Sequence, residues 1–470
     1  MNLKIYNSMT RKEELFVPRE EGKVNMYVCG PTVYDYIHIG NARPVIFFDV
    51  ARRYLESLGL EVNYIVNFTD VDDKMIRKAN EMGITVPELA EKFIAAFKED
   101  RDGLGARPAT LQPRVTETIP EIIDFIDGLV KKGAAYENGG DVYFRTSTFP
   151  EYGKLSHKNL DELQYGIRID VDERKESPQD FVLWKAAKPG EIYWASPWGN
   201  GRPGWHIECS AMVHKYAGDT LDIHGGGHDL QFPHHECEIA QSESLTEEPL
   251  ARYWMHNGFV NIDNQKMSKS LGNGINVRNL LKMAKKESIR YLMLATHYRS
   301  PLNFSDEILK QADRSVERLA NSRDNVVHRL STVAKGSLSL AKDEALQARL
   351  AELQAQFNAS MDDDFGTPDA ITAWFGLVAE ANNYLQRESV SEADLLAILE
   401  RFEAMDNVLG LLPAREEAGL LDEEVDALIA ERAEARSSRN WKRADEIRDL
   451  LAKRGIVLED TPQGMRWRRK

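Results

Sequence analysis

The sequence contains few cysteines and no long apolar run. Three of the 470 residues are cysteine, at positions 29, 209 and 237, and none forms a CxxC pair. A disulfide framework is therefore not expected, and the thiols are better suited to metal binding or catalysis in a reducing compartment. No apolar run approaches the roughly 18 residues of a membrane span, and the N-terminus lacks the apolar segment of a signal peptide. We expect a cytoplasmic protein without a membrane partner.

The usual phosphate-binding loops are also missing or out of place. No GxxxxGK[ST] motif is present. Residues 199–204 satisfy GxGxxG, and Asp222 follows at the spacing of an NAD-binding fingerprint. However, the preceding residues 193–198 do not have the pattern of a buried strand, and Pro203 removes a backbone donor from the supposed loop. We therefore reject a dehydrogenase, and ATP would have to bind through another motif.

Charge is distributed unevenly along the chain. The formal net charge of −15 argues against a nucleic-acid partner, because phosphate binding depends on Lys and Arg. Residues 436–470 nevertheless contain eleven basic and five acidic side chains. A basic tail on an acidic protein is compatible with RNA binding, although a solvated helix face accounts equally well for the charge alone.

The apolar pattern near the N-terminus predicts an α/β fold. Residues 24–28 and 62–68 are typical of buried strands, and a helix is expected between them from about Ala42. Pro44 would lie in the first turn of this helix, and Gly59 would end it. The three elements form a βαβ unit, which is characteristic of a parallel sheet.

The expected secondary structure changes several times along the rest of the chain. The regular apolar spacing is lost over residues 120–197, which indicates an insertion between two halves of the sheet. A second α/β half follows from 198 to about 240. Ser305 is a predicted N-cap for a series of helices interrupted by a linker at 336–340. Two short strands within residues 456–467 predict a terminal hairpin. At this length we expect two to four domains.

Four residues of zinc-ligating types are widely separated in the sequence: Cys29, Cys209, His234 and Glu238. His234 and Glu238 would project from one face of a helix and could bind one ion. An isolated pair at this spacing is more often solvated, but two cysteines favour a metal site. His235, Glu236 and Cys237 remain alternative ligands, since Cys237 would lie only about 60° around the helix from His234. A small buried residue is the more common role for such a cysteine.

Two short motifs could bind a nucleotide. His38-Ile39-Gly40-Asn41 lies at the carboxyl edge of the first predicted strand, where open α/β sheets hold phosphate groups. Lys266-Met267-Ser268-Lys269-Ser270 places two lysines on a glycine-flanked loop, where they could neutralise charge that develops on a triphosphate. A surface loop explains the second motif by itself, but the pair of motifs favours ATP.

These motifs resemble those of the cysteinyl-tRNA synthetases, a family of class I aminoacyl-tRNA synthetases, along essentially the whole chain. The matching stretches are YVCGPTVYD (27–35), NFTDVDDK (67–74), GRPGWHIECS (201–210), DIHGGG (222–227), Asp229-Leu230 and FPHHE (232–236). The resemblance implies a Rossmann-like parallel sheet catalytic domain split by an insertion, followed by α-helical domains and a small C-terminal α+β anticodon-binding tail.

The resemblance also implies roles for individual residues. One zinc ion per chain is expected on Cys29, Cys209, His234 and Glu238. The amino acid pocket is expected to comprise Gly30, Thr32, Thr69, Trp205, His224 and Asp229. ATP with Mg²⁺ is expected at His38, Gly40, Asn41, Lys266 and Lys269, of which His38, Lys266 and Lys269 are catalytic. tRNA contacts are expected from Arg439, Trp441, Lys442, Arg466, Trp467 and Arg468.

The implied partners are tRNA(Cys), ATP and L-cysteine. We expect the protein to be a monomer. The implied domains are the two catalytic halves at 1–119 and 198–245, the connective insertion at 120–197, the KMSKS and stem-contact region at 246–304, the helical bundle at 305–410 and the anticodon-binding domain at 411–470. Related enzymes that join cysteine to an amino sugar lack the anticodon-reading tail, so the basic C-terminus favours a tRNA ligase. A non-catalytic paralogue is disfavoured, because both nucleotide motifs and all four ligands are present.

Two positions depart from the family pattern. Asn41 stands where the broad class I motif has His, so it can donate a hydrogen bond but cannot become cationic. Cys237 stands where the family commonly has Asn, which places a spare thiol beside the expected metal and makes its redox behaviour a question for the structure.

Overall fold

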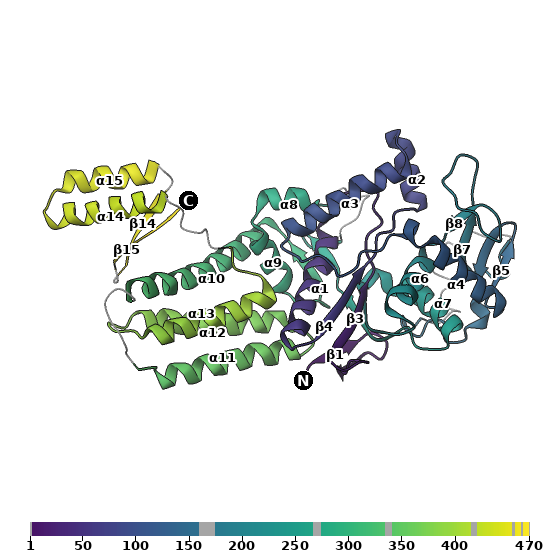
Figure 1. Cartoon of the computed structure of the whole chain (residues 1–470), viewed down its shortest axis with the longest axis horizontal. Helices are drawn as coiled ribbons and strands as arrows, with labels where there is room; N and C mark the ends of the chain where they lie inside the picture. Colours follow the sequence, from purple (N-terminus) through teal and green to yellow (C-terminus); the bar gives the residue numbers. More distant parts are fainter. Residues whose placement is uncertain are drawn as a thin grey trace. The chain divides into compact units, whose positions relative to one another are not determined.

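The structure is a computed structural model of the whole chain, and Figure 1 gives its elements. It describes residues 2–158, 174–266, 274–333, 341–414, 421–453, 456–461 and 464–469. The chain divides into two compact units. The first comprises Met1–Ser315, Gln356–Thr372 and Asn407–Leu411, and the second comprises Val316–Ala355, Ala373–Asp406 and Leu412–Lys470.

A four-stranded parallel sheet forms the centre of the first unit, as the sequence predicts. Its strand order is β10-β9-β3-β4, with β3 at Lys23–Val28, β4 at Glu61–Val66, β9 at Leu221–Gly227 and β10 at Ala251–Asn257. The predicted strands at 24–28 and 62–68 are therefore confirmed, although β4 ends at Val66. Because the strands run in the same direction, their carboxyl ends share one edge of the sheet, and Cys29, Gly227 and Asn257 lie at or beside that edge.

Helix α1 (Ile39–Ser57) connects β3 to β4 and completes the predicted βαβ unit (Figure 1). It begins three residues before the predicted start at Ala42, because His38 and Asn41 close a capping box around its first turn. Pro44 consequently lies in the second turn rather than the first, where its missing N–H removes one helical hydrogen bond. Gly59 follows the end of the helix with φ of +84°, as expected for a helix terminator.

The predicted insertion folds as an antiparallel sheet. Helix α4 (Ile119–Lys131) leads into strands β5 (Ala135–Asn138), β6 (Asp141–Phe144), β7 (Phe181–Ala186) and β8 (Gly201–Pro203), which pair in that order. Gly201 of the GxGxxG pattern lies in β8, where a Cβ would be 2.3 Å from the carbonyl oxygen of Lys185, and a Cβ on Gly204 would be 2.1 Å from the carbonyl oxygen of Val182. The pattern is therefore a close approach between strands and not a phosphate loop.

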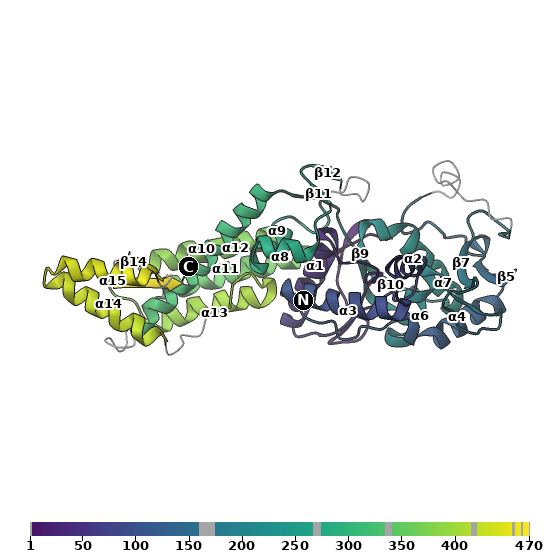
Figure 2. The ribbon, with the colours of Figure 1, turned by 90° about the horizontal axis from the view of Figure 1, so that it is seen from above.

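The remaining elements of the first unit surround the parallel sheet. They are β1 (Lys4–Asn7), β2 (Lys12–Leu15), α2 (Asp73–Met82), α3 (Val86–Gly103), α6 (Trp205–Ala217), α7 (Glu236–Thr246), β11 (Val260–Ile262), β12 (Gln265–Lys266), α8 (Val277–Met283), α9 (Lys286–Leu294) and β13 (Leu302–Phe304). Figure 2 shows the hairpin of β11 and β12 projecting from the body of this unit.

Four long helices follow, as predicted for the region after Ser305. They are α10 (Asp306–Val333), α11 (Glu344–Asp362), α12 (Thr367–Leu385) and α13 (Glu392–Leu409). Ser305 caps α10 by accepting a hydrogen bond from the backbone N–H of Ile308 at 3.3 Å. Within the second unit α12 packs against α13 through Trp374 and Phe402, whose ring centroids are 6.3 Å apart. The predicted linker at 336–340 lies outside the described residues.

The C-terminal residues form a small α+β module with its own core. Helices α14 (Leu421–Ser437) and α15 (Trp441–Lys453) precede the antiparallel strands β14 (Ile456–Thr461) and β15 (Gly464–Arg469). The predicted hairpin is confirmed, with Leu458 opposite Trp467. The core of the module contains Val425, Ile447, Leu451 and Ile456.

No helix in the described part of the chain is long and apolar enough to cross a membrane.

Candidate active site and metal centre

The structure brings the four predicted metal ligands together at the carboxyl edge of the parallel sheet. Cys29 directly follows β3 and Cys209 lies on α6, whereas His234 belongs to a π-helical turn (Gln231–His235) that leads into α7, the helix of Glu238. One ligand atom from each residue lies within 4.8 Å of the others. Except for Cys29, which is half-buried, these residues are buried.

The separations within this cluster fit a tetrahedral ion. Two thiolates at the usual Zn–S distance of about 2.3 Å from one tetrahedral ion lie about 3.8 Å apart, and a thiolate and an imidazole nitrogen lie about 3.5 Å apart. The Sγ atoms of Cys29 and Cys209 are 3.8 Å apart, and Cys209 Sγ is 3.6 Å from His234 Nε2. Glu238 Oε1 completes the group at 2.9 Å from His234 Nε2 and 3.3 Å from Cys29 Sγ. The donor set and its spacing therefore suit a zinc ion.

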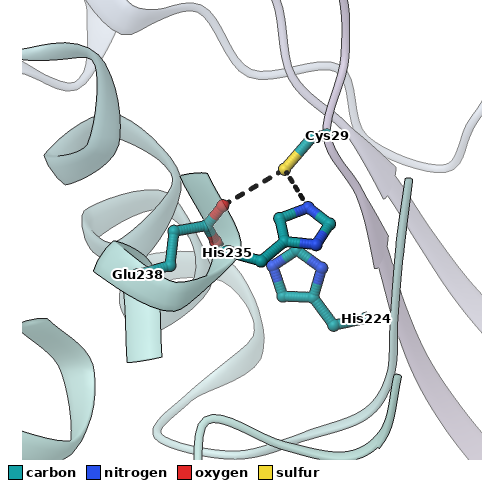
Figure 3. A group of neighbouring side chains, drawn as sticks. All are labelled: Cys29, His224, His235 and Glu238. Carbon is teal, nitrogen blue, oxygen red and sulfur yellow. Dashed lines mark hydrogen bonds and ion pairs between the residues drawn. The ribbon is translucent and has the colours of Figure 1, made fainter. Parts of the chain in front are cut away.

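A second possible ligand set shares two members with the first. Figure 3 shows Cys29 directed toward both Glu238 and His235, with His224 beside them. His235 Nε2 is 3.4 Å from Cys29 Sγ, and His224 Nε2 is 2.7 Å from Glu238 Oε2. His235, an alternative ligand in the sequence, thus remains near the centre. The set with two cysteines is favoured for zinc because it supplies two soft thiolate ligands.

The other two alternatives in the sequence point away from the cluster. Glu236 accepts hydrogen bonds from the backbone amides of Leu155 and Ser156, at 3.3 and 2.8 Å. Cys237 Sγ is 3.2 Å from the hydroxyl of Tyr152. Burial raises the pKa of the Cys237 thiol, so this cysteine remains protonated and unreactive near neutral pH. It is a core residue rather than a fifth ligand.

The clustered side chains shift one another's pKa values. Hydrogen bonding from Cys29 lowers the pKa of Cys209 to about 6, while burial raises the pKa of Cys29 well above its usual value. Burial alone would raise the pKa of Glu238, but His224 and His234 lower it well below the ordinary range. Burial would lower the pKa of His234, but Glu238 and Cys209 raise it to about 10, so protonated His234 compensates negative charge in the cluster. A divalent cation would replace this proton.

A cavity of about 510 Å³ opens beside the cluster and runs along the N-terminus of α1. It is lined by eight of the residues that the sequence assigns to the metal, amino acid or nucleotide: Cys29, Gly30, Thr32, His38, Gly40, Asn41, Trp205 and Asp229. Trp205 stacks on His234 with ring centroids 4.3 Å apart, so it lies at the boundary between the cavity and the cluster. Residues expected at the amino acid and residues expected at the nucleotide thus line the same cavity.

Two residues expected around the amino acid lie one layer behind this cavity. Thr69 is buried, and its hydroxyl donates to Glu208 at 2.7 Å. His224 is buried beneath Glu238 and stacks on Trp254 with centroids 4.5 Å apart. Neither residue is among those that line the cavity.

The start of α1 explains the unusual Asn41. His38 Nδ1 accepts a hydrogen bond from the backbone N–H of Gly40, and Asn41 Oδ1 accepts one from the backbone N–H of His38, both at 3.1 Å. Asn41 therefore completes the cap of α1, and His38, Gly40 and Asn41 line the cavity. The positive end of this helix is suited to phosphate groups.

The remaining predicted residues lie elsewhere or outside the description. Lys266 is the last residue of β12, and Lys269 lies outside the described residues. Among the predicted tRNA contacts, Arg439, Trp441 and Lys442 lie at the turn between α14 and α15, where the Trp441 ring is 59% exposed. The other three, Arg466, Trp467 and Arg468, belong to β15.

Sequence patterns alone did not identify Arg43, which supports the site from within α1. Its buried guanidinium donates to the carbonyl oxygens of Gly258, Phe259 and His297 at 2.8, 3.2 and 2.9 Å. Burial lowers the pKa of Arg43 to about 10, which leaves it charged at neutral pH. Its only signal in the sequence is an arginine on the apolar face of a predicted helix.

Comparisons with known proteins agree with this fold. The family described as tRNA synthetases class I (C) catalytic domain matches residues 15–314, a DALR domain matches 356–413, and a cysteinyl-tRNA ligase anticodon binding domain matches 418–468. Cysteine–tRNA ligases from Halalkalibacterium halodurans and Anoxybacillus flavithermus are 57% and 55% identical over 469 residues, which is 100% of this chain and of each relative. The solved structure of Mycobacterium tuberculosis methionyl-tRNA synthetase in complex with methionyl-adenylate matches with a TM-score of 0.62. The match covers 83% of this chain and 90% of that one at 17% identity. At this identity, the similarity supports the fold only.

The parallel sheet, the capped helix beside the cavity and the matched catalytic domain define a class I aminoacyl-tRNA synthetase. The full-length relatives and the matched anticodon binding domain narrow this class to one member. The chain belongs to the cysteinyl-tRNA synthetase (cysteine–tRNA ligase) family.

Proposed function

We propose that the chain activates L-cysteine with ATP to form cysteinyl-adenylate and then transfers the cysteinyl group to the 3′ end of tRNA(Cys). Cysteine–tRNA ligases that span the whole chain at more than half identity support this reaction. The observation that carries its chemistry is the cluster of Cys29, Cys209, His234 and Glu238 at one end of the nucleotide-sized cavity.

Selection of cysteine over serine is the central problem of this reaction. The two amino acids differ by one atom, and a pocket that reads only shape gains about 1 to 3 kcal/mol from such a difference. We infer that Cys29, Cys209, His234 and Glu238 hold one zinc ion. A bound zinc ion would lower the pKa of a thiol and prefer its sulfur to a serine hydroxyl. Trp205, stacked on His234 at the cavity wall, would then confine the amino acid beside the cluster.

The nucleotide is proposed to lie along the N-terminus of α1. His38 and the positive end of α1, at Gly40 and Asn41, would hold the phosphates, which enter with Mg²⁺. Lys266, at the end of the hairpin of β11 and β12, and Lys269, which follows it in the sequence, would neutralise the charge of the phosphates. The cysteine carboxylate would attack the α-phosphate and release pyrophosphate. No side-chain nucleophile is needed, so positioning and electrostatic stabilisation would provide the rate.

Cysteine-dependent exchange between ATP and pyrophosphate tests the proposal. We expect the purified chain to catalyse exchange with cysteine and to prefer cysteine to serine by more than about 1,000-fold, which exceeds what shape alone provides. Prolonged treatment with a chelator should abolish exchange, and added zinc should restore it. Efficient activation of serine by the zinc-loaded protein would contradict the selection mechanism.

The C-terminal module is proposed to bind the anticodon of the tRNA through Arg439, Trp441, Lys442, Arg466, Trp467 and Arg468. The Trp441 ring is 59% exposed although its module has an apolar core of other residues, so it is available for stacking on an unpaired base. The matched anticodon binding domain supports this assignment and disfavours an amino-sugar ligase.

Replacing Trp441 by Ala should lower kcat/KM for tRNA charging about tenfold, because a base stacked on an aromatic ring contributes about 1 to 3 kcal/mol. Pyrophosphate exchange and the melting temperature should stay unchanged, since the ring is largely exposed. Leu450→Ala, at another exposed apolar residue of α15, is the matched control. Equal charging by the Trp441 variant and the wild type would remove this residue from the tRNA interface.

A further inference from the structure

One buried amide beside the cavity lacks hydrogen-bond partners. Asn257 is the last residue of β10 and is 2% exposed, yet neither its Nδ2 nor its Oδ1 has a partner among the described residues. Among the buried side chains in the described part of the chain, it is the one whose amide donor and acceptor both lack a partner. Buried amides are nearly always paired because desolvation is otherwise uncompensated. Such an amide at a binding cavity indicates a ligand that supplies both missing partners.

The position of Asn257 suits one part of a nucleotide. It lines the cavity together with Gly258, Phe259 and Val260, and the same cavity contains His38 at the N-terminus of α1. The chain continues from these residues directly into the hairpin of β11 and β12, which ends at Lys266. A triphosphate between the α1 terminus and Lys266 would therefore leave its base beside residues 257–259. This placement rests on the ATP site of the proposed function.

The backbone after Asn257 is held firmly in place. Arg43 donates to the carbonyl oxygens of Gly258 and Phe259, and the N–H of Gly258 donates to the carbonyl oxygen of Tyr298 at 2.8 Å. A Cβ on Gly258 would lie 2.6 Å from the carbonyl oxygen of Arg299, so the two segments touch backbone to backbone. The amide is consequently presented on a rigid support, which reduces the entropy lost on binding.

We propose that Asn257 recognises the adenine of ATP through its side-chain amide. Oδ1 would accept a hydrogen bond from the N6 amino group, and Nδ2 would donate one to the adjacent ring nitrogen, a pairing that an asparagine amide matches in geometry. The Phe259 ring, 36% exposed at the cavity, provides a flat apolar surface next to the base. Asn257 thus determines specificity for the purine in the activation step.

Removing single groups from both partners tests the contact. The nucleotides are ATP and purine riboside 5′-triphosphate, which lacks the N6 amino group, and the readout is kcat/KM in cysteine-dependent pyrophosphate exchange. We expect the wild type to prefer ATP by about tenfold or more. Asn257→Leu and Asn257→Ala should lower kcat/KM for ATP about 10- to 100-fold and reduce the preference to within about twofold, because the N6 group has lost its partner. The KM for cysteine should stay within about twofold.

Stability provides an independent readout. Because the Asn257 amide is unpaired without ligand, Asn257→Leu should leave the melting temperature of the free protein unchanged or raise it, and should reduce the increase caused by ATP. Asn63→Leu is the matched control, since Asn63 Nδ2 donates to Asn25 Oδ1 at 2.9 Å in the same sheet. That variant should lower the melting temperature and keep the preference for ATP.

The possible failures are distinguishable. If the wild type shows no cysteine-dependent exchange, the proposed function itself is wrong. If the wild type is active but the Asn257 variants lose equal activity with ATP and with purine riboside triphosphate, Asn257 does not read the N6 group and the inference is overturned. A lower melting temperature for both Asn257 variants would show that the amide is paired in the free protein and would also overturn it.

Discussion

Replacing Cys209 by Ser should remove most of the bound zinc and lower cysteine-dependent pyrophosphate exchange by more than about 100-fold. Loss of a residue that only orients a metal ligand commonly costs 10- to 100-fold, so loss of a ligand should cost more. Cys209 is 3.8 Å from Cys29 and 3.6 Å from His234, and its lowered pKa of about 6 makes its thiolate available near neutral pH. A serine hydroxyl is a harder and far less acidic ligand. Metal analysis of the purified protein and the exchange assay together measure the effect.

Cys237 provides the matched control for this substitution. It undergoes the same change of sulfur to oxygen on a buried residue, but its side chain contacts Tyr152 rather than the ligand cluster. Cys237→Ser should therefore retain zinc and exchange activity, with a cost in unfolding free energy of about 1 kcal/mol. Loss of zinc from the Cys237 variant to the same extent as from the Cys209 variant would falsify the assignment of ligands.

Replacing His38 by Asn should lower kcat for cysteine activation about 100- to 1,000-fold without destabilising the protein. The imidazole lines the cavity at the N-terminus of α1, where charge develops on the phosphates, and removal of one such donor from a preorganised site costs this much in related chemistry. His38 also caps the helix through Nδ1, and asparagine is an equally good capping residue. Only the chemical role is therefore removed.

His38→Ala separates the two roles of this residue. It should lose as much activity as His38→Asn and in addition lower the unfolding free energy by about 1 kcal/mol, because the cap is lost. Exchange kinetics and thermal unfolding of the two variants make the comparison. Near-normal activity of His38→Asn would mean that the residue serves α1 only as its cap.

Local patterns in the sequence predicted the elements that carry the site. The strands before Cys29 and before Asn67, the helix after His38 and the terminal hairpin follow from apolar spacing and turn residues, and the structure confirms them. The start of α1 was missed by three residues, because a histidine is an uncommon capping residue and the role of Asn41 in the cap is visible only in coordinates.

Contacts between distant segments could not be derived in this way. Cys29 and Glu238 are 209 residues apart, and only the resemblance to a known family placed them in one ligand set. Spacing alone left Glu236 and Cys237 as alternatives, which the structure directs toward residues 152–156. Thr69 and His224 were expected to surround the amino acid. Both are buried, and neither is among the residues that line the cavity. Asn257 carries no motif, and its unpaired amide appears only when its neighbours are known.

Helix α7 is bound to the segment around residues 154–156 at two positions besides Glu238. Glu238 faces the cluster, whereas Glu236 binds the amides of Leu155 and Ser156 and Glu243 pairs with Lys154. Release of an ion from the proposed site would break its bond to the Glu238 carboxylate, and the helix that carries this residue is held in place by these bonds. They would therefore slow the release of zinc. Zinc acquired during folding would stay with the same molecule for much of its lifetime, even when the surrounding supply of the metal falls.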